Sequence, residues 1–446
     1  MERLNLLNLL KKLQKIDVSN EEIANIIFNQ EEKVLNLLAD LDEEKLKMSI
    51  DIIEIYLSID YDAFEAISLL KNSKYYQYTY KVLTDVDTIE NGIALEGAKI
   101  ISESEHDFNA GYAWLVLKSE YAIKVGIALE GAKIVSESEH DFNAEYAWVV
   151  LNNENAIKAG IALEGAKIIS ESEHNFNAEY AFRVLANDKA IEAGIALDGA
   201  KIINESQHRF NACSASSVLV NEYAIEAEIA LEGAKIVNES KHDFNAENAR
   251  DVLTSAVAID GGIAIEGAKI VNESKYDFNA ESASLVLRNF NVIKGGIAIL
   301  GAKIVNESQH GCNAYLASSV LANVNAIKEG IALEGAKIVN VANEGFSSEY
   351  TSQFLNYYGI IINEPIGNRL ILETARAISK FKNEYRTRCA YYSLSDKSSC
   401  ETVIKQSKLE KFFDELISEL ESDSCKNVEP KQYIKKLCPK NNKYVN

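Results

Sequence analysis

Histidine is the residue whose spacing first suggests chemistry in this sequence. The chain has six histidines, and all share one register with a 34-residue period, in which Tyr276 fills the gap before the last one. A row of imidazoles could bind metal ions or respond to pH near neutrality. Stacked helical units would hold neighbouring copies ~8–10 Å apart, too far for two to share one metal ion. We expect each histidine at a helix C-terminus, where it suits the negative end of the helix dipole. The six are His106, His140, His174, His208, His242 and His310.

The other residue types used in catalysis form no recognisable set. The sequence contains no Gly-Lys-Ser/Thr phosphate-binding loop, no His-Glu-x-x-His pair and no Gly-x-Ser-x-Gly nucleophile motif. No histidine lies outside the repeated register, and the carboxylates recur as strips in which no pair stands out. The cysteines fit no zinc signature, and we expect free thiols. They are Cys213, Cys312, Cys389, Cys400, Cys425 and Cys438. We therefore predict that the protein is not an enzyme and has no cofactor and no metal.

Charge and hydropathy limit the classes of partner. The formal net charge is −21 and the isoelectric point is near 4.9, which argues against nucleic acid and anionic membranes, since phosphate binding relies on Lys and Arg. No apolar run approaches transmembrane length. Charged residues such as Lys11 and Lys12 interrupt the N-terminal leucines, so residues 1–20 do not form a signal peptide. We expect a cytoplasmic or otherwise intracellular monomer.

One nine-residue stretch sets the organisation of the chain. It reads Gly-Ile-Ala-Leu-Glu-Gly-Ala-Lys-Ile from Gly126 to Ile134 and recurs every 34 residues without insertion. The copies begin at Gly92, Gly126, Gly160, Gly194, Glu228, Gly262, Gly296 and Gly330. A fixed period of this length is typical of repeat arrays. The sequence predicts an all-α fold, an α-solenoid of 34-residue two-helix repeats with helical caps.

Capping residues predict the helices within one copy. With position 1 placed at Phe142, position 2 is always Asn and position 12 is always Asn or Ser, as in Asn143 and Asn153. Both are strong helix N-caps, which predicts a short helix over positions 3–11 and a longer one from position 13 to the low thirties. Gly165 would then lie mid-helix, where we expect close backbone approach between stacked helices. We expect Lys167 to pair locally on its own helix rather than across repeats.

The segments outside the repeats predict caps. Residues 1–73 have helical patterns and a Ser19/Glu22 capping box, which is typical of an N-terminal helical cap over the first repeat. Residues 74–363 hold the tandem repeats. Residues 364–446 are predicted to contain a C-terminal cap helix, a small amphipathic helix near Cys400–Glu421 and a lysine-rich tail.

The repeat length and helix pattern resemble two known families in part. The length equals that of tetratricopeptide repeats, but the Trp, Leu-Gly and Tyr pattern of their first helix is not followed. The short-then-long division is more similar to the repeats of TAL effectors, which read DNA bases through the loop between helices. Here that loop carries Glu154, Asp188 or Phe290 and lacks the glycine pair. We assign no family, and the resemblance implies a nucleic-acid reader only as an alternative, which the net charge disfavours.

One face of the first helix varies most between copies. Positions 3, 6 and 10, such as Ala144, Ala147 and Leu151, form an apolar stripe, and positions 4, 7, 8 and 11 lie on the opposite face. Position 7 is aromatic in three successive copies, at Trp114, Trp148 and Phe182. Aromatic residues on a rigid face favour a protein interface, although these rings could instead pack sideways against the next repeat. We predict a scaffold that binds a protein or peptide partner through this face. The predicted contact residues are Trp114, Leu115, Lys118, Trp148, Val149, Asn152, Phe182, Arg183, Arg250, Leu285 and Arg288.

Overall fold

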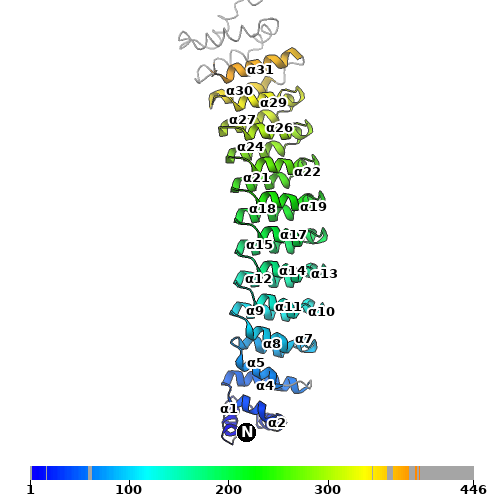
Figure 1. The fold of residues 1–446 in the computed structure, drawn as a ribbon, viewed down its shortest axis with the longest axis vertical. Coiled ribbons are helices and arrows are strands. Elements are labelled where there is room, and N and C mark those ends of the chain that lie inside the picture. The colour runs from blue at the N-terminus through cyan, green and yellow to red at the C-terminus, as the bar shows by residue number, and fades with distance from the viewer. Residues whose placement is uncertain are drawn as a thin grey trace, which may run out of the picture. The chain divides into compact units, whose positions relative to one another are not determined.

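The structure is a computed structural model and describes residues 3–16, 18–58, 63–343, 345–358, 365–380, 387–388 and 391. These residues form α-helices and their connections, with no β-strand among them. The chain divides into two compact units, Met1–Ser216 and Ser217–Asn446, which are described separately below. Figure 1 shows the helices of each unit. Within the described ranges, no helix has the length and apolar character needed to cross a membrane.

The first unit begins with five helices that precede the regular pattern. They are α1 (Arg3–Lys15), α2 (Asn20–Asn29), α3 (Glu32–Ala39), α4 (Glu43–Ser58) and α5 (Ala63–Asn72). The capping box at the start of α2 is confirmed. The Ser19 hydroxyl accepts the Glu22 backbone N–H at 3.2 Å, and the Glu22 carboxylate accepts the Ser19 backbone N–H at 2.8 Å. Two of the orphan donors at this helix N-terminus are thereby satisfied.

The regular part of the first unit has three helices in each 34-residue period. The first helices are α6 (Tyr76–Thr84), α9 (Asp107–Leu117), α12 (Asp141–Leu151) and α15 (Asn175–Leu185). The short helices are α7 (Val86–Glu90), α10 (Glu120–Lys124), α13 (Glu154–Lys158) and α16 (Asp188–Glu192). The third helices are α8 (Ala94–Glu103), α11 (Ala128–Ser136), α14 (Ala162–Ser170) and α17 (Ala196–Asn204). Helix α18 (Arg209–Leu219) contains the division between the units.

The second unit repeats this order. Its first helices are α21 (Asp243–Leu253), α24 (Asp277–Leu287), α27 (Gly311–Ala322) and α30 (Phe346–Tyr358). Its short helices are α19 (Glu222–Glu226), α22 (Ala256–Asp260), α25 (Phe290–Lys294) and α28 (Val324–Lys328). Its third helices are α20 (Ala230–Asn238), α23 (Ala264–Asn272), α26 (Ala298–Asn306) and α29 (Ala332–Asn340), and α31 (Pro365–Ser379) follows α30.

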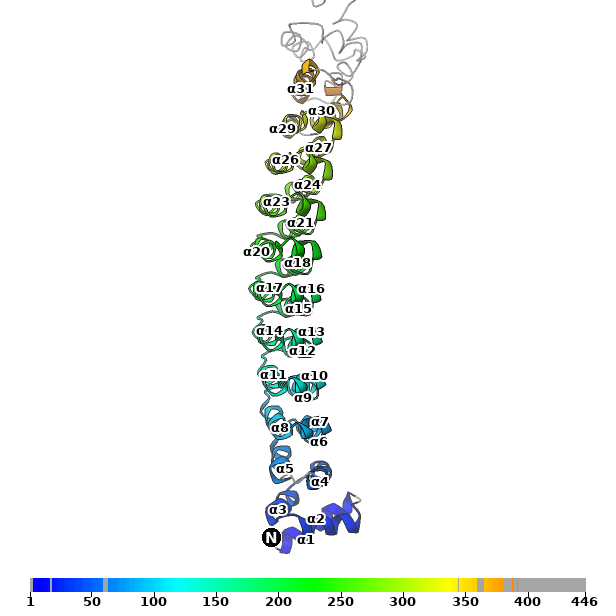
Figure 2. The same ribbon diagram turned by 90° about the vertical axis from the view of Figure 1, so that its right-hand side faces the viewer.

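Within a unit, helices of the same kind pack beside one another. In the first unit α9, α12 and α15 form one layer and α11, α14 and α17 form the other (Figure 2). The core lies between these layers, where Ala147, Val150 and Leu151 of α12 and Ala166 and Ile169 of α14 are fully buried. The first helices thus bury an apolar stripe at helical spacing, as their sequence predicts.

The long second helix predicted from the sequence is wrong, because it is divided in two. Helix α13 ends at Lys158, Gly160 has a φ of +73°, and α14 begins at Ala162. The Gly160 N–H donates to the Ile157 carbonyl and the Ile161 N–H to the Ala156 carbonyl, both at 3.0 Å. This is the Schellman pattern, in which a left-handed residue after the helix end lets two orphan carbonyls be satisfied. Each repeat therefore contains three helices rather than two.

The asparagine at position 2 caps a different helix end from the one predicted. Helix α12 already begins at Asp141, so Asn143 lies inside its first turn and is 1% exposed. Its Nδ2 donates to the carbonyls of Ser170 (2.9 Å) and Ser172 (3.1 Å), at the end of α14. The side chain therefore satisfies carbonyls at the C-terminus of the third helix. The N-cap predicted at position 12 is confirmed, since the Asn153 Oδ1 accepts the Ala156 N–H at 2.8 Å.

The histidines also differ from their predicted place. His140 follows α11 and is the N-cap residue of α12, so the prediction that it ends a helix is wrong. Its ring stacks on Phe142 with centroids 5.0 Å apart. Five of the six histidines, and Tyr276, make the same stacked pair with the aromatic residue two positions on.

The small residues and charges of the third helix pack differently from the expectation. A Cβ at Gly165 would lie 3.0 Å from the Leu185 Cδ2 and 3.2 Å from the Val150 Cγ1. The glycine therefore makes room for side chains of two first helices, not for another helix backbone.

The lysines of the third helices pair mainly between copies, as in Lys201–Glu164 at 2.8 Å, so the prediction of local pairs is wrong there. The same inter-copy pair is made by Lys269 and by Lys303.

The segment predicted to contain a C-terminal cap helix includes α31, which begins at Pro365, where proline can start a helix. The helix expected near Cys400–Glu421, the lysine-rich tail and the four C-terminal cysteines lie outside the described residues.

Candidate functional site

The aromatic residues of the variable face lie between neighbouring first helices of the first unit. Trp114, Trp148 and Phe182 are half-buried. Each ring contacts a tyrosine from position 5 of the preceding copy. The centroid distances are 6.2 Å for Tyr78–Trp114, 5.7 Å for Tyr112–Trp148 and 5.7 Å for Tyr146–Phe182. We call these six residues the aromatic row.

The aromatic row is partly a packing feature. Sideways packing between copies, an alternative that the sequence left open, is present at all three positions. The Trp148 indole nitrogen is buried without a hydrogen-bond partner. Burial also raises the pKa of the Tyr112 and Tyr146 hydroxyls, with further contributions from nearby carboxylates. Because the rings remain half-buried rather than buried, the row still offers aromatic surface to a partner.

Cations flank the ends of the aromatic row. The Lys81 Nζ lies 4.3 Å and the Lys118 Nζ 4.7 Å from the centre of the Trp114 ring, so two ammonium groups contact one indole. At the other end, the Arg183 guanidinium lies 4.7 Å from the Tyr180 ring and donates to the Glu179 carboxylate at 2.5 Å. The cation–π contacts orient Lys81 and Lys118 and leave their ammonium groups accessible to an acidic group on a partner, whereas Arg183 already has an acidic partner in Glu179.

The smaller predicted contact residues lie beside the row. Leu115 and Val149 are half-buried at position 8. Lys118 and Asn152 follow the last residues of α9 and α12 as C-cap residues, with Lys118 exposed and Asn152 half-buried. The structure therefore brings the predicted residues of the first unit onto one continuous set of first helices.

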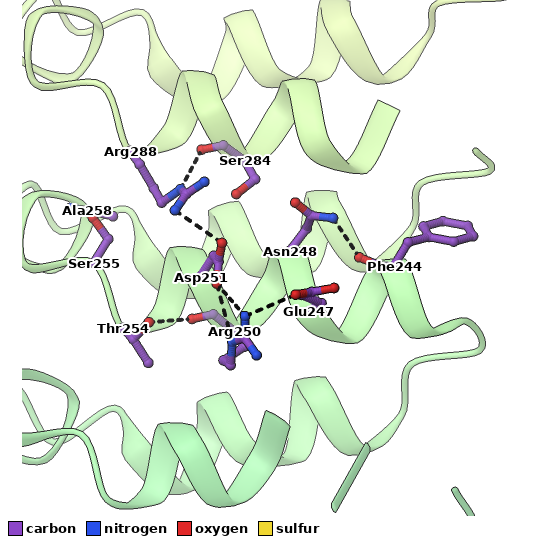
Figure 3. Close-up of polar contacts among 10 residues, drawn as sticks. All are labelled: Phe244, Glu247, Asn248, Arg250, Asp251, Thr254, Ser255, Ala258, Ser284 and Arg288. Carbon is purple, nitrogen blue, oxygen red and sulfur yellow. Dashed lines mark hydrogen bonds and ion pairs between the residues drawn. The ribbon is translucent and has the colours of Figure 1, made fainter. Parts of the chain in front are cut away.

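In the second unit, ion pairs replace the aromatic residues on the first helices. The Arg250 Nη2 lies 2.8 Å from the Asp251 Oδ1 and 3.5 Å from a Glu247 carboxylate oxygen (Figure 3). The Arg288 Nη1, from the next first helix, lies 3.1 Å from the Asp251 Oδ2, and its Nε donates to the Ser284 carbonyl at 3.4 Å. Asp251 thus joins the two predicted arginines, and both already have acidic partners within the chain.

Position 7 is small and buried in the second unit beyond Arg250. Ser284 is 0% and Ser318 is 7% exposed, so neither offers surface to a partner. Leu285 at position 8 is 43% exposed, which agrees with its predicted accessibility. The two units therefore present different first-helix surfaces, one aromatic and one ionic.

Sequence reasoning missed the tyrosines at position 5. Tyr112 and Tyr146 complete the aromatic row, and they lie 36 residues before their partners Trp148 and Phe182. That separation is one period plus two residues, so a search for aromatic pairs across neighbouring copies would have found them. The spacing within a single helix face does not show them, because their partners lie in the next copy.

The described residues contain no group of three or more His, Cys, Asp or Glu side chains placed to hold a metal ion. Cys312 is an exposed thiol. The chain matches no protein-family model, and no curated protein is significantly similar to it in sequence.

Proposed function

We propose that this protein is an α-solenoid of 34-residue repeats with helical caps that acts as a non-catalytic scaffold for a protein or peptide partner. The regular recurrence of three helices per period within each unit supports the repeat architecture. A partner would bind the outer face of the first helices of the first unit. The aromatic row carries the proposal, because half-buried tyrosines and tryptophans are the residues that dominate protein interfaces.

The two units would contribute differently to this function. The first unit offers aromatic surface with two cations at one end, Lys81 and Lys118, while Arg183 at the other end is paired with Glu179. The second unit offers Arg250 and Arg288, whose charges are engaged with Asp251. A partner that bound these arginines would first have to break their ion pairs with Asp251. Exchanging one ion pair for another adds little to the free energy of binding. We therefore assign the principal contacts to the first unit.

The test is a parallel capture from lysate with two sets of variants. Trp114→Ser, Trp148→Ser and Phe182→Ser remove the aromatic row, while Leu115→Glu and Val149→Glu add charge to the same face without removing a ring. A Tyr121→Ser variant is the matched control, because Tyr121 is 47% exposed on the short helix α10.

A partner bound by the wild type and the Tyr121 control, but lost with both other sets, supports the proposal. Recovery that is equal for all variants would contradict it. Circular dichroism melts of each variant separate loss of binding from loss of folding. A capture that nuclease treatment abolishes would instead favour a nucleic-acid reader.

A further inference from the structure

A second surface in the first unit lies in the grooves between successive third helices. One groove, of about 770 Å³, separates α8 from α11. The next, of about 460 Å³, separates α11 from α14, and we call it the α11–α14 groove. Both are lined by third-helix residues and by the loops that lead into the first helices, and the α11–α14 groove also by Asn143 of α12. They are distinct from the aromatic row, whose residues line neither groove.

The grooves of the first unit are strongly acidic. The α11–α14 groove is lined by four glutamates and one lysine, a formal net charge of −3 with neutral His140. These residues are Glu137, Glu139, Glu171, Glu173 and Lys167. The groove between α8 and α11 has six glutamates and two lysines, a formal net charge of −4. Charges of one sign inside a groove with low-dielectric walls attract the opposite charge.

A buried acceptor without a donor forms part of the α11–α14 groove. Asn143 lines the groove and is 1% exposed. Its Nδ2 faces the Ser170 and Ser172 carbonyls, which fixes the orientation of the amide. The Oδ1 therefore points away from them, and it has no hydrogen-bond partner. An unsatisfied buried acceptor is costly, and the same atom lacks a partner in other copies, including Asn245 of the second unit.

The second unit contains the same groove with the opposite charge. The groove between α20 and α23 is about 710 Å³, is lined at the same repeat positions and includes Asn245. Glu139 and Glu173 are replaced there by Lys241 and Lys275. Two glutamates and three lysines give a formal net charge of +1. The fold thus accommodates either an acidic or a basic side chain at these two positions. The residues there decide whether the groove is negative or positive.

We propose that the acidic grooves of the first unit bind an extended basic peptide segment. Neighbouring third helices pack ~8–10 Å apart, and a chain in the extended polyproline II conformation advances ~3.1 Å per residue with three residues per turn, so that every third side chain lies on the same side. A basic residue at every third position would therefore meet successive grooves, and its guanidinium or ammonium group would lie among the glutamates near Asn143. The partner is a Lys- or Arg-containing peptide with this spacing, which differs in chemistry from a ligand of the aromatic row.

The experiment measures fluorescence anisotropy of two labelled peptides of equal composition. One has the repeated sequence Arg-Gly-Ser, and the other has all its arginines in one block followed by Gly-Ser repeats. We expect the full-length protein to bind the spaced peptide more tightly, with an affinity that falls as salt rises. The double variant Glu139→Lys/Glu173→Lys should bind it about tenfold more weakly. This variant copies the residues of the second unit, so it should fold.

Two further variants make the result specific. Glu120→Lys/Glu192→Lys changes the net charge equally but on exposed residues of short helices, and it should keep the affinity within about twofold. Lys241→Glu/Lys275→Glu should add a binding site to the second unit. Equal binding of the spaced peptide by the wild type and Glu139→Lys/Glu173→Lys would overturn the proposal, as would no preference for the spaced peptide. Leu115→Glu should leave this binding unchanged, which keeps the test separate from that of the aromatic row.

Discussion

Replacement of Glu228 by glycine should stabilise the second unit. Glu228 occupies the helix-breaking position that is glycine in every other copy, and it has a φ of +59°. Its backbone makes the usual pattern, with the Glu228 N–H donating to Ile225 and the Ile229 N–H to Ala224. It is the one non-glycine residue with positive φ among the described residues. The break between α19 and α20 is therefore present here although the left-handed residue is a glutamate.

The magnitude follows from conformation alone. At the equivalent glycines, including Gly262, no atom lies within 4 Å of an added Cβ, so the side chain meets no obstacle. A non-glycine residue in the left-handed region costs about 1–2 kcal/mol. Glycine itself lowers the stability of the folded state by about 0.5–1 kcal/mol, because it has greater conformational freedom in the unfolded chain. Glu228→Gly should thus raise the free energy of unfolding by about 0.5–1 kcal/mol, and Gly262→Glu should lower it by a similar amount.

Thermal melts by circular dichroism and hydrogen exchange measure the effect. Both tryptophans lie in the first unit, so their fluorescence does not report on Glu228 directly. We expect the transition of the second unit to rise by ~1–4 °C and the amides of α19 and α20 to exchange more slowly. A Glu228→Ala variant, which keeps a Cβ, is the control and should not be stabilised. If Glu228→Gly melts at or below the wild type, or Gly262→Glu melts unchanged, the reasoning about left-handed strain is refuted.

Three other predictions concern the first unit. Gly165→Leu should destabilise it by about 2–3 kcal/mol through overpacking, and an unchanged urea midpoint would contradict the contacts with Leu185 and Val150. Asn177→Ala removes an amide that donates to three carbonyls at the end of α17, so we expect a loss of about 1–3 kcal/mol; a loss no greater than that of an exposed Asn→Ala change would count against this role. Burial and a hydrogen bond to Asp51 raise the pKa of Tyr80 from 10.0 to about 12. The stability that the protonated Tyr80 hydroxyl gives the folded state is therefore complete below pH 10 and is lost as pH rises to about 12. Urea titrations across this range should show a smaller loss of stability in Tyr80→Phe than in the wild type, and equal losses would exclude Tyr80 as a cause.

The sequence predicted the helical content and the buried stripe because both depend on local periodicity. Ala147 and Leu151 fall on the predicted stripe and are fully buried. The exact 34-residue period also predicted that each structural feature would recur. The capping box at Ser19 was predictable because both partners lie within four residues.

The errors came from interactions that act across a turn or between copies. The continuous helix through Gly160 is a wrong prediction, because a glycine shortly after Lys158 is typical of a helix end in the left-handed conformation. The local pattern places Asn143 at the nearest helix start, whereas its acceptors lie 27 and 29 residues away along the chain. The tyrosines of the aromatic row were missed for the same reason. Whether the variable face or the acidic grooves bind a partner depends on molecules that the sequence does not contain.

The hydrogen bonds that join helices also bear on how the chain is made. The Asn143 amide reaches 27 and 29 residues ahead, and the Asn204 amide reaches 36 residues back. A ribosome adds one 34-residue copy in about 2–7 s, whereas helices and short loops form within microseconds. Each copy can therefore close while its near-identical successors are still unmade. Ordered synthesis from the N-terminus would thus protect the chain from pairing between wrong copies, a hazard that refolding of the full-length chain from denaturant would restore.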